Sequence, residues 1–408
     1  MRNRALLSLV IGALLLNAAA SRTIQLPARQ ATSVSSVTIP FELANKHIVL
    51  KVKVNNSRTL SFVLDTGDKF AIIDLERARE LKLDLHGQVR MGGAGSQLST
   101  GAFVRDASFT IPGFDGFSQP MALALPINNL AGRLGQDFDG IIGSDFIKEF
   151  IVEVDYQARV IKLHDKRTFT YSGPGESIPI KLNSHGHPIV EAEVTPMGSP
   201  PITGKFVLDI GSGLALALYS PFVAERQLLN PNVKTIKALS GAGAGGETSG
   251  RFGRVSELKI GKFRIKNLIT FFSEDKAGAF ASPSLLGNIG AQITSRFRIL
   301  LDYSGERVIF EPNATFSDGF DRAFGGFTLQ ADGPDYKTFR IIAVLENSPA
   351  SEAGLQKNDV ITEVDGRPTA HLTLTKLNEM FERPVSYKLT VRRGEQVLPV
   401  ILTPRKLV

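Results

Sequence analysis

Apolar and polar residues alternate along several short segments of the chain, a pattern that indicates β-strands with one face buried. The alternation is clearest over residues 47–54, 159–163 and 188–194. Turn-forming pairs such as Asn55-Asn56 and Gly261-Lys262 separate the strand-like segments. In each of two regions one short helical stretch is expected, at 75–83 and at 220–229. We therefore predict a mainly β protein.

The chain repeats itself. Three pairs of segments match in the same order: 61–67 with 205–211, 140–143 with 284–287, and 150–156 with 297–303. The offset is 209 − 65 = 144 residues for the first two pairs and 302 − 155 = 147 for the third. A glycine-rich stretch lies between the markers in each half. An ordered repeat of this kind predicts two similar β lobes related by a pseudo-twofold axis.

Each half contains a fully apolar strand that runs straight into an aspartate. Phe-Val-Leu precedes Asp65 in the first half and Asp209 in the second, and Gly67 and Gly211 follow two residues later. A carboxylate at the end of a buried strand is costly unless it has a partner or a purpose. Glycine allows the chain to turn tightly beneath it and another backbone to approach. The pseudo-twofold axis would bring Asp65 and Asp209 together, where they would share one proton.

These residues resemble the aspartic peptidases of the pepsin and retropepsin type. The resemblance covers about residues 38–311 and rests on Asp65-Thr66-Gly67 with Ile141-Ile142-Gly143, and on Asp209-Ile210-Gly211 with Leu285-Leu286-Gly287. It implies that Asp65 and Asp209 are catalytic and activate a water for peptide-bond hydrolysis. It also implies that Ile142, Gly143, Leu286 and Gly287 support the two loops. Two flap hairpins, as in a retropepsin fused into one chain, are expected at the glycine-rich stretches: Gly92, Gly93 and Gly95, and Gly241, Gly243 and Gly245.

Two positions depart from the family pattern. The family places a hydroxyl at the middle of both triplets to bond across the interface; Thr66 keeps it and Ile210 does not. The residue after each triplet is Asp68 in the first half and Ser212 in the second, where retropepsins commonly have alanine and pepsins serine or threonine. A third carboxylate beside the pair would raise the proton affinity of the pair. A duplicated β protein whose aspartates cap turns remains the structural alternative.

The sequence changes character after about residue 323. Ser348-Pro-Ala350, Ala353-Gly-Leu355 and 359–366 resemble the bacterial PDZ domain, with Asn358 in place of its usual glycine. The resemblance covers about residues 325–404. It implies that Gly325, Gly326, Phe327 and Leu329 form a carboxylate-binding loop and an edge strand for peptide C-termini, and that 372–382 is the groove helix. A small α+β packing module without a ligand is the alternative.

The N-terminus and the composition indicate where in the cell the protein is found. Arg2 and Arg4, an apolar run at 5–16 and Ala18-Ala19-Ala20 are typical of a signal peptide, and an uncleaved anchor is the alternative. The chain has no cysteine, so it has no disulfide and no thiolate metal site. We expect an exported bacterial protein, periplasmic or secreted, without a stable membrane span after cleavage. The expected domains are 1–20 signal peptide, 21–36 linker or short propeptide, 37–166 and 175–312 the two lobes, and 323–405 the PDZ-like domain.

Other functions have little support in the sequence. The net charge of +7 is spread along the chain without clusters of basic and aromatic residues, so no nucleic-acid partner is expected. Residues 241–246 fit a dinucleotide-binding glycine pattern but lack the following helix, and His185-Gly-His187 has no third ligand at a metal-site spacing. We expect no cofactor and no metal. No Gly-x-Ser-x-Gly elbow occurs.

The sequence therefore leaves two main hypotheses for function. The first is an aspartic endopeptidase whose PDZ-like domain tethers protein or peptide substrates. The second is a non-catalytic exported peptide-binding or scaffold protein with a degenerate peptidase cleft. A chaperone or transport adaptor would rest on the PDZ-like domain alone. The intact aspartates favour the first hypothesis, and Ile210 and Asp68 favour the second.

Overall fold

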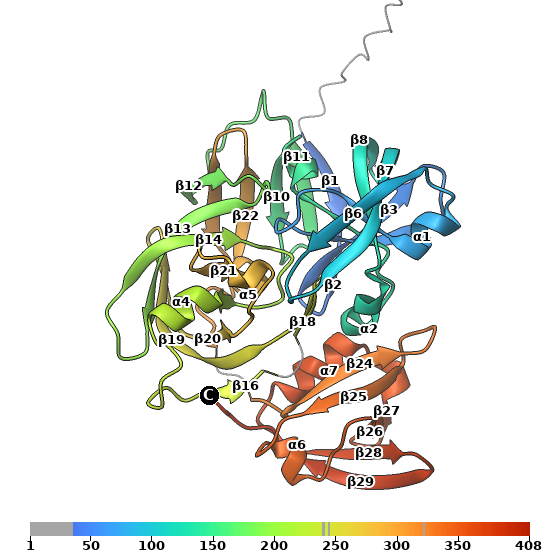
Figure 1. Cartoon of the computed structure of the whole chain (residues 1–408), viewed down its shortest axis with the longest axis vertical. Coiled ribbons are helices and arrows are strands. Elements are labelled where there is room, and N and C mark those ends of the chain that lie inside the picture. The colour runs from blue at the N-terminus through green and yellow to red at the C-terminus, as the bar shows by residue number, and fades with distance from the viewer. Residues whose placement is uncertain (1–35, 239–240, 244, 321–322) are drawn as a thin grey trace, which may run out of the picture. The chain divides into compact units, whose positions relative to one another are not determined.

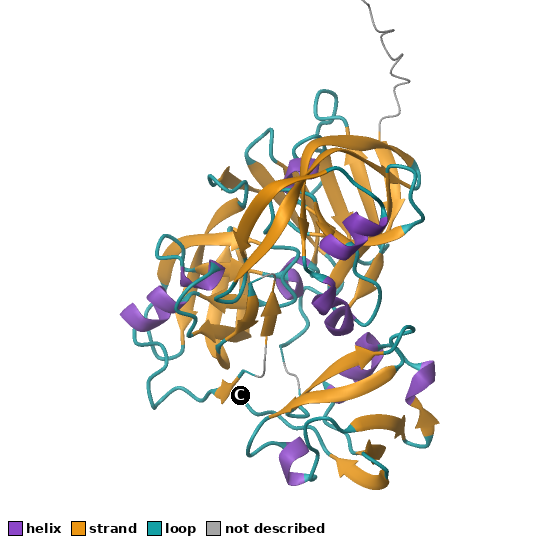
Figure 2. Cartoon of the chain, turned by 45° about the vertical axis from the view of Figure 1, so that its right-hand side comes forward, coloured by secondary structure: helices purple, strands orange, loops and turns teal. Residues whose placement is uncertain are grey.

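The computed structural model describes residues 36–408, apart from 239–240, 244 and 321–322. The expected signal peptide and all but the last residue of the expected linker lie outside the described residues. Strands dominate the described chain, as Figure 2 shows, so the mainly β prediction is confirmed. Residues 47–54 form a strand with the predicted bounds, and the helices at 75 and 220 are shorter than predicted.

Lobe one is an eight-stranded sheet in the order β2-β3-β4-β9-β5-β8-β7-β6, with an additional β3–β7 pairing. Its strands are β2 (Glu42–Ala44), β3 (His47–Val54), β4 (Leu60–Leu64), β5 (Ile72–Asp74), β6 (Leu85–Gly92), β7 (Leu98–Ile111), β8 (Phe114–Leu125) and β9 (Gly140–Ile142). The helical segments of this half are α1 (Leu75–Glu80), η1 (Asn128–Leu130), α2 (Ala131–Leu134) and α3 (Ser144–Ile147). The buried Asp74 carboxylate caps α1 by accepting the Glu76 and Arg77 N–H groups.

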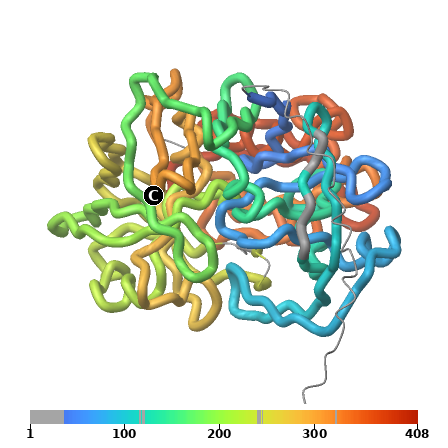
Figure 3. Tube along the Cα trace, turned by 90° about the horizontal axis from the view of Figure 1, so that it is seen from above, coloured from blue at the N-terminus to red at the C-terminus, as the bar shows by residue number. Residues whose placement is uncertain are grey.

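Lobe two repeats this arrangement with the second half of the chain. Its strands are β13 (Pro188–Pro196), β14 (Ile202–Leu208), β15 (Leu216–Leu218), β16 (Ile236–Lys237), β17 (Gly241–Gly243), β18 (Gly246–Thr248), β19 (Gly250–Ile260), β20 (Phe263–Ser273) and β21 (Gly287–Ile289). Its helical segments are α4 (Ser220–Glu225), η2 (Ala279–Ala281) and α5 (Ala291–Thr294). Figures 1 and 3 let the reader follow the strands of lobe one from blue to green and those of lobe two from green to orange.

Strands from both halves pair in one sheet. They are β1 (Ser36–Pro40), β10 (Ile151–Asp155), β11 (Val160–His164), β12 (Glu176–Leu182), β22 (Phe297–Asp302) and β23 (Arg307–Pro312). The central pairing is antiparallel β10–β22, with Val152 opposite Leu301 and Val154 opposite Ile299. This register is symmetric. With the 147-residue offset, Val152 corresponds to Ile299 and Val154 corresponds to Leu301, so each of the two pairs is the repeat of the other. The buried faces of both lobes contribute to one apolar core.

The PDZ-like part has its own sheet and core. Its strands are β24 (Phe327–Asp332), β25 (Thr338–Val344), β26 (Val360–Val364), β27 (Arg367–Pro368), β28 (Tyr387–Arg393) and β29 (Gln396–Leu402). The order is β24-β25-β26-β28-β29, which leaves β24 at one edge. Its helical segments are α6 (Pro349–Glu352), η3 (Thr369–His371) and α7 (Leu374–Phe381). Leu329, Ile341, Leu377 and Val391 belong to a core cluster separate from that of the lobes. Within the described residues no helix is both long and apolar enough to span a bilayer.

Candidate active site

The two aspartates leave equivalent strands. Asp65 follows β4, and Asp209 follows β14. Each of these strands pairs in parallel with the short strand that supports it: β4 with β9, and β14 with β21. The Asp65 N–H donates to the Ile142 carbonyl at 3.0 Å, and the Asp209 N–H donates to the Ile289 carbonyl at 2.9 Å. The same backbone bond thus fixes the start of both loops.

This pairing corrects the predicted support element of lobe two. In lobe one Leu64 pairs with Ile142, and in lobe two Leu208 pairs with Ile289. The equivalent of Ile142-Gly143 is therefore Ile289-Gly290, whereas the predicted Leu286 and Gly287 lie three residues too early. The error arose because Leu285-Leu286-Gly287 also reads as apolar-apolar-Gly, while lobe two has three extra residues before the true element. Gly287 occupies the position of Gly140, and Leu286 packs beside Gly204.

The loops place the two carboxylates side by side. A Cβ added to Gly67 would lie 3.1 Å from Cγ of Asp209, and one added to Gly211 would lie 2.0 Å from Cγ of Asp65. Each triplet glycine therefore lies against the carboxylate of the other lobe, and no larger residue fits at Gly211. Both carboxylates are partly buried. The structure thus brings Asp65 and Asp209 together.

Thr66 joins the loops across the lobe interface. Its hydroxyl donates to the Leu208 carbonyl at 2.6 Å and accepts the Ile210 N–H at 3.0 Å. Both Thr66 and Ile210 are completely buried. Ile210 has no hydroxyl to return these bonds, so the cross-lobe connection is made from one side and Ile210 contributes apolar packing instead.

The two carboxylates receive different hydrogen bonds. Oδ1 of Asp65 accepts the Gly67 N–H at 2.6 Å. Oδ1 of Asp209 accepts the Ser212 N–H at 2.9 Å, and its Oδ2 accepts an Asn288 amide N–H at 2.8 Å. Sequence reasoning missed Asn288 because the misplaced support element ended one residue before it. The signal was available in the 147-residue offset of the later marker.

The surroundings of the site raise the pKa values of Asp65 and Asp68. Burial raises the pKa of Asp65 well above its usual range, and the neighbouring charges of Asp209 and Asp68 raise it further. Burial and then Asp209 raise the pKa of Asp68 to about 7. Asp68 is half-buried and its charge interacts with those of both dyad aspartates.

Histidine and tyrosine side chains also lie near the pair, and sequence reasoning did not assign them to the site. The His47 ring lies beside the loop of lobe two, where a Cβ on Gly213 would be 3.2 Å from its Cε1. Nδ1 of His47 contacts the Asn45 carbonyl at 2.9 Å, and burial lowers the pKa of His47. Burial also lowers the pKa of His187, which senses the charge of Asp209. Burial, followed by the charges of Asp65 and Asp209, raises the pKa of Tyr303.

The predicted flap glycines lie on two hairpins whose tips meet. Gly92 ends β6 and Gly93 and Gly95 follow in the turn before β7; Gly241 and Gly243 lie in β17 and Gly245 precedes β18. The Gln97 N–H donates to the Gly245 carbonyl at 2.8 Å, and the Gly245 N–H donates to the Ala94 carbonyl at 2.9 Å. The Ala279 N–H donates to the Gly93 carbonyl at 3.0 Å. Backbone hydrogen bonds therefore link the two hairpins directly.

The predicted PDZ residues lie at the start of β24. The Gly326 carbonyl accepts the Leu345 N–H at 2.8 Å and so continues the pairing of β24 with β25. The Phe327 ring packs edge-on against Phe381 of α7 with ring centroids 5.2 Å apart. Leu329 is 5% exposed and belongs to the domain core. The space expected to form a pocket between these residues and α7 is therefore partly filled by their own side chains.

Both edges of this groove contact lobe one. The Asn45 N–H donates to Oγ1 of Thr375 at 2.9 Å, and Asn378 of α7 donates to the Asn45 side chain at 3.2 Å. Gly132 of α2 lies against β24, where a Cβ would come 2.9 Å from Cγ of Gln330. The groove helix and the edge strand thus face the peptidase-like part.

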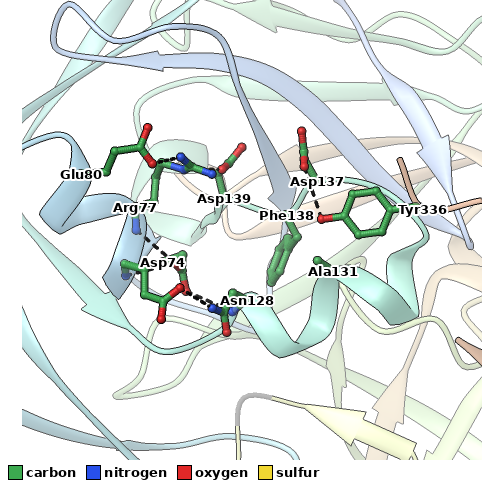
Figure 4. A pocket seen from close by; sticks show the side chains of 10 residues that line it. Asp74, Arg77, Glu80, Asn128, Ala131, Asp137, Phe138, Asp139 and Tyr336 are labelled. Carbon is green, nitrogen blue, oxygen red and sulfur yellow. Dashed lines mark hydrogen bonds and ion pairs between the residues drawn. The ribbon is translucent and has the colours of Figure 1, made fainter. Parts of the chain in front are cut away.

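A polar pocket of about 170 Å³ lies at the same junction and is separate from the carboxylate pair. Figure 4 shows Arg77 between Asp139 and Glu80, and Tyr336 of the PDZ-like part directed at Asp137. The Arg77 Nε–Asp139 Oδ1 distance is 2.7 Å, and Asp139 is buried. These groups satisfy one another, so the pocket is a feature of the junction and not a reactive centre. The described residues contain no group of three or more His, Asp or Glu side chains that could hold a metal ion.

Two family models match the chain. Residues 50–146 match the model described as aspartyl protease, and residues 340–393 match the PDZ domain. Serine protease HTRA1 of Xenopus laevis is 28% identical over 67 residues, covering 16% of this chain and 14% of that protein. A probable CtpA-like serine protease of Staphylococcus haemolyticus is 24% identical over 143 residues, covering 34% of this chain and 27% of that protein. The chain thus spans less than a third of either relative.

A solved structure, Basic 7S globulin from soybean, aligns with a TM-score of 0.42 and 10% identity over 70% of this chain and 97% of that one. The family matches confirm the predicted combination of an aspartyl protease region followed by a PDZ domain.

Proposed function

We propose that this chain is an exported aspartic endopeptidase in which Asp65 and Asp209 form the catalytic dyad. One observation carries the proposal: equivalent strands from two repeated lobes deliver the two carboxylates to the same point, each beside the glycine of the other loop. Two carboxylates so close hold one proton between them over a wide pH range. The raised pKa of Asp65 fits that state.

The chemistry needs only this pair and a water. The ionised carboxylate takes a proton from the water while the water oxygen attacks the scissile carbonyl carbon. The protonated carboxyl donates its proton to the carbonyl oxygen. The product is a neutral tetrahedral diol, and the dyad has exchanged its proton. Collapse then protonates the amine, breaks the C–N bond and leaves a carboxylic acid. No covalent enzyme intermediate forms.

The substrates proposed are extended peptide segments of proteins. The joined hairpin tips would form the roof of the cleft, and exposed backbone of the hairpins would bind the peptide as an added strand. The PDZ-like domain, with boundaries at about 323–405, would tether substrates through peptide C-termini. The lobes would extend over about 37–166 and 175–312, behind the signal peptide that directs export.

The aspartic type is preferred to the serine type that the names of the relatives carry. A serine nucleophile requires a histidine base that is oriented by a third group. Among the described residues, a Ser–His side-chain hydrogen bond joins the neighbours Ser184 and His185 in an exposed turn. That pair has no burial and no acidic partner to orient it. The carboxylate cluster, by contrast, is partly buried and has perturbed pKa values.

Peptide-library digestion between pH 3 and 8 tests the proposal. Wild type should cleave, and Asp65→Asn and Asp209→Asn should each lose at least about 10³-fold in kcat/KM, because the two residues act as a unit. Asp318→Asn is the matched control, since Asp318 is exposed and distant in sequence from both loops. Near-wild-type turnover by either dyad variant would refute the mechanism.

A second candidate is a peptide-binding protein that does not cleave. Asp68 favours it, because its carboxylate has a pKa of about 7. Catalysis needs one proton shared by Asp65 and Asp209, and a third titrating carboxylate near them can change the number of protons that the pair holds. In that case the same library would be bound and recovered intact at every pH.

A further inference from the structure

The dyad is not symmetric, although the lobes are. Asn288 lies in β21 at the position that Ile141 occupies in β9, as the pairing of Val207 with Asn288 and of Val63 with Ile141 shows. Both side chains are buried, at 2% and 5% exposure. An amide therefore stands beside Asp209 at a place where an aliphatic side chain stands in lobe one.

The buried amide of Asn288 makes a hydrogen bond with only one of its two polar atoms. Nδ2 donates to Oδ2 of Asp209 at 2.8 Å, while Oδ1 of Asn288 is buried and has no hydrogen-bond partner among the described residues. A buried acceptor without a partner costs free energy, so an aliphatic residue such as leucine would serve the fold at least as well. The bond to Asp209 is the interaction that offsets this cost.

Donors near a carboxylate favour its ionised form. Asp209 has two of them, the Ser212 N–H on Oδ1 and the Asn288 amide on Oδ2. Asp65 accepts the Gly67 N–H and has the aliphatic Ile141 at the mirror position. The hydrogen bonds therefore distinguish two chemically identical side chains.

The other titratable groups around the pair do not reverse this difference. The groups that sense the charge of Asp209 come from both lobes: Asp65, Asp68, His47, Tyr156, His187, Tyr219 and Tyr303. The histidines have lowered pKa values and the tyrosines raised ones, so at neutral pH all of them are uncharged. At pH values well below 7 Asp68 is protonated as well, and the dyad carries the charge of the cluster.

We propose that Asn288 is a positioning residue that holds the negative charge of the dyad on Asp209 and leaves the shared proton on Asp65. The proposal rests on the proposed function for its catalytic meaning. It assigns Asp209 as the base that takes the proton of the water and Asp65 as the acid that protonates the carbonyl oxygen. Asn288 touches neither water nor substrate in this scheme and acts through Asp209.

Carboxyl NMR of the full chain labelled with ¹³Cγ-aspartate tests this without relying on turnover. Difference spectra of Asp65→Asn and Asp209→Asn identify the two resonances. In wild type, the Asp209 resonance should titrate to the ionised position at a lower pH than that of Asp65. Asn288→Leu removes the amide donor to Oδ2 of Asp209 and leaves the Ser212 N–H in place, and it should raise the lower apparent pKa of the dyad by about one unit, a tenfold change in the ionisation constant. Ile141→Leu, the mirror control, should leave it unchanged.

The outcomes separate the two proposals. A wild-type spectrum in which Asp65 ionises first overturns the assignment, and it does so even if Asn288→Leu fails to fold. A folded Asn288→Leu protein with an unchanged lower pKa overturns the role of Asn288. A chain that cleaves nothing refutes the proposed function and still gives both titrations. Where cleavage is measurable, the acid limb of kcat/KM should move upward with the same one-unit shift in Asn288→Leu.

Discussion

Replacing Asp68 with asparagine should make the protein more stable at neutral pH and should not do so in acid. Burial and the charge of Asp209 raise the pKa of Asp68 to about 7, against 3.8 for the ordinary side chain. An acid whose folded pKa is raised binds its proton more tightly in the folded state than in the unfolded state. Its contribution to stability is therefore complete below pH 3.8 and is lost as the pH rises through 7.

The size of the effect follows from the shift. A rise of about three pH units corresponds to about 4 kcal/mol of unfolding free energy lost between acid and slightly alkaline pH. Asp68→Asn keeps the shape of the side chain and removes its charge. Wild type and variant should consequently be equally stable near pH 3.5, and the variant should be more stable by up to about 4 kcal/mol at pH 8.

Urea denaturation of both proteins at pH 3.5, 5, 6.5 and 8 measures this difference. Asp318→Asn, the change at an exposed aspartate, controls for the loss of one negative charge on the whole chain. In the activity profile, Asp68→Asn should move the alkaline limb to lower pH, because Asp65 then loses its proton without a second negative neighbour. Parallel stability curves for wild type and Asp68→Asn would show that Asp68 is not ionised beside the dyad, and would refute the reasoning.

Three further changes test other parts of the structure. Thr66→Val should lower the free energy of unfolding by about 2–4 kcal/mol, because two buried backbone groups of lobe two lose their partner. Thr66→Ser keeps the hydroxyl and should retain most of the wild-type stability when both variants are measured by urea denaturation. Gly95→Ala should separate the hairpin tips, since its Cβ would lie 2.4 Å from the Gly245 carbonyl oxygen, and should reduce kcat/KM with an unchanged melting temperature. Asn378→Ala should weaken the contact of α7 with lobe one. It should increase the affinity of the full chain, measured by calorimetry, about 2- to 10-fold for a peptide ending in Lys-Leu-Val, the last three residues of this chain. Equal affinities would mean that lobe one does not limit access to the groove.

The sequence alone determined the features that depend on local pattern and repetition. Alternation located β3 at its true bounds, and the repeated Phe-Val-Leu-Asp segments identified both loops and the pairing of Asp65 with Asp209. Those signals are local, because strand periodicity and turn residues are properties of a few consecutive positions. The two β lobes followed from the repeat, and the PDZ-like domain followed from the resemblance of residues 348–366 to the bacterial PDZ motif.

Tertiary structure decided what depends on register between distant segments. In lobe two Leu285-Leu286-Gly287 fits the apolar-apolar-Gly pattern, but the parallel pairing of β14 with β21 shows that the next triplet, Asn288-Ile289-Gly290, supports the loop. That register brings Asn288 to Asp209. The approach of His47 to Gly213 and the contact of Asn45 with α7 likewise join residues far apart in the chain. No local pattern specifies such contacts, because they depend on how the packed lobes and the PDZ-like part place their loops.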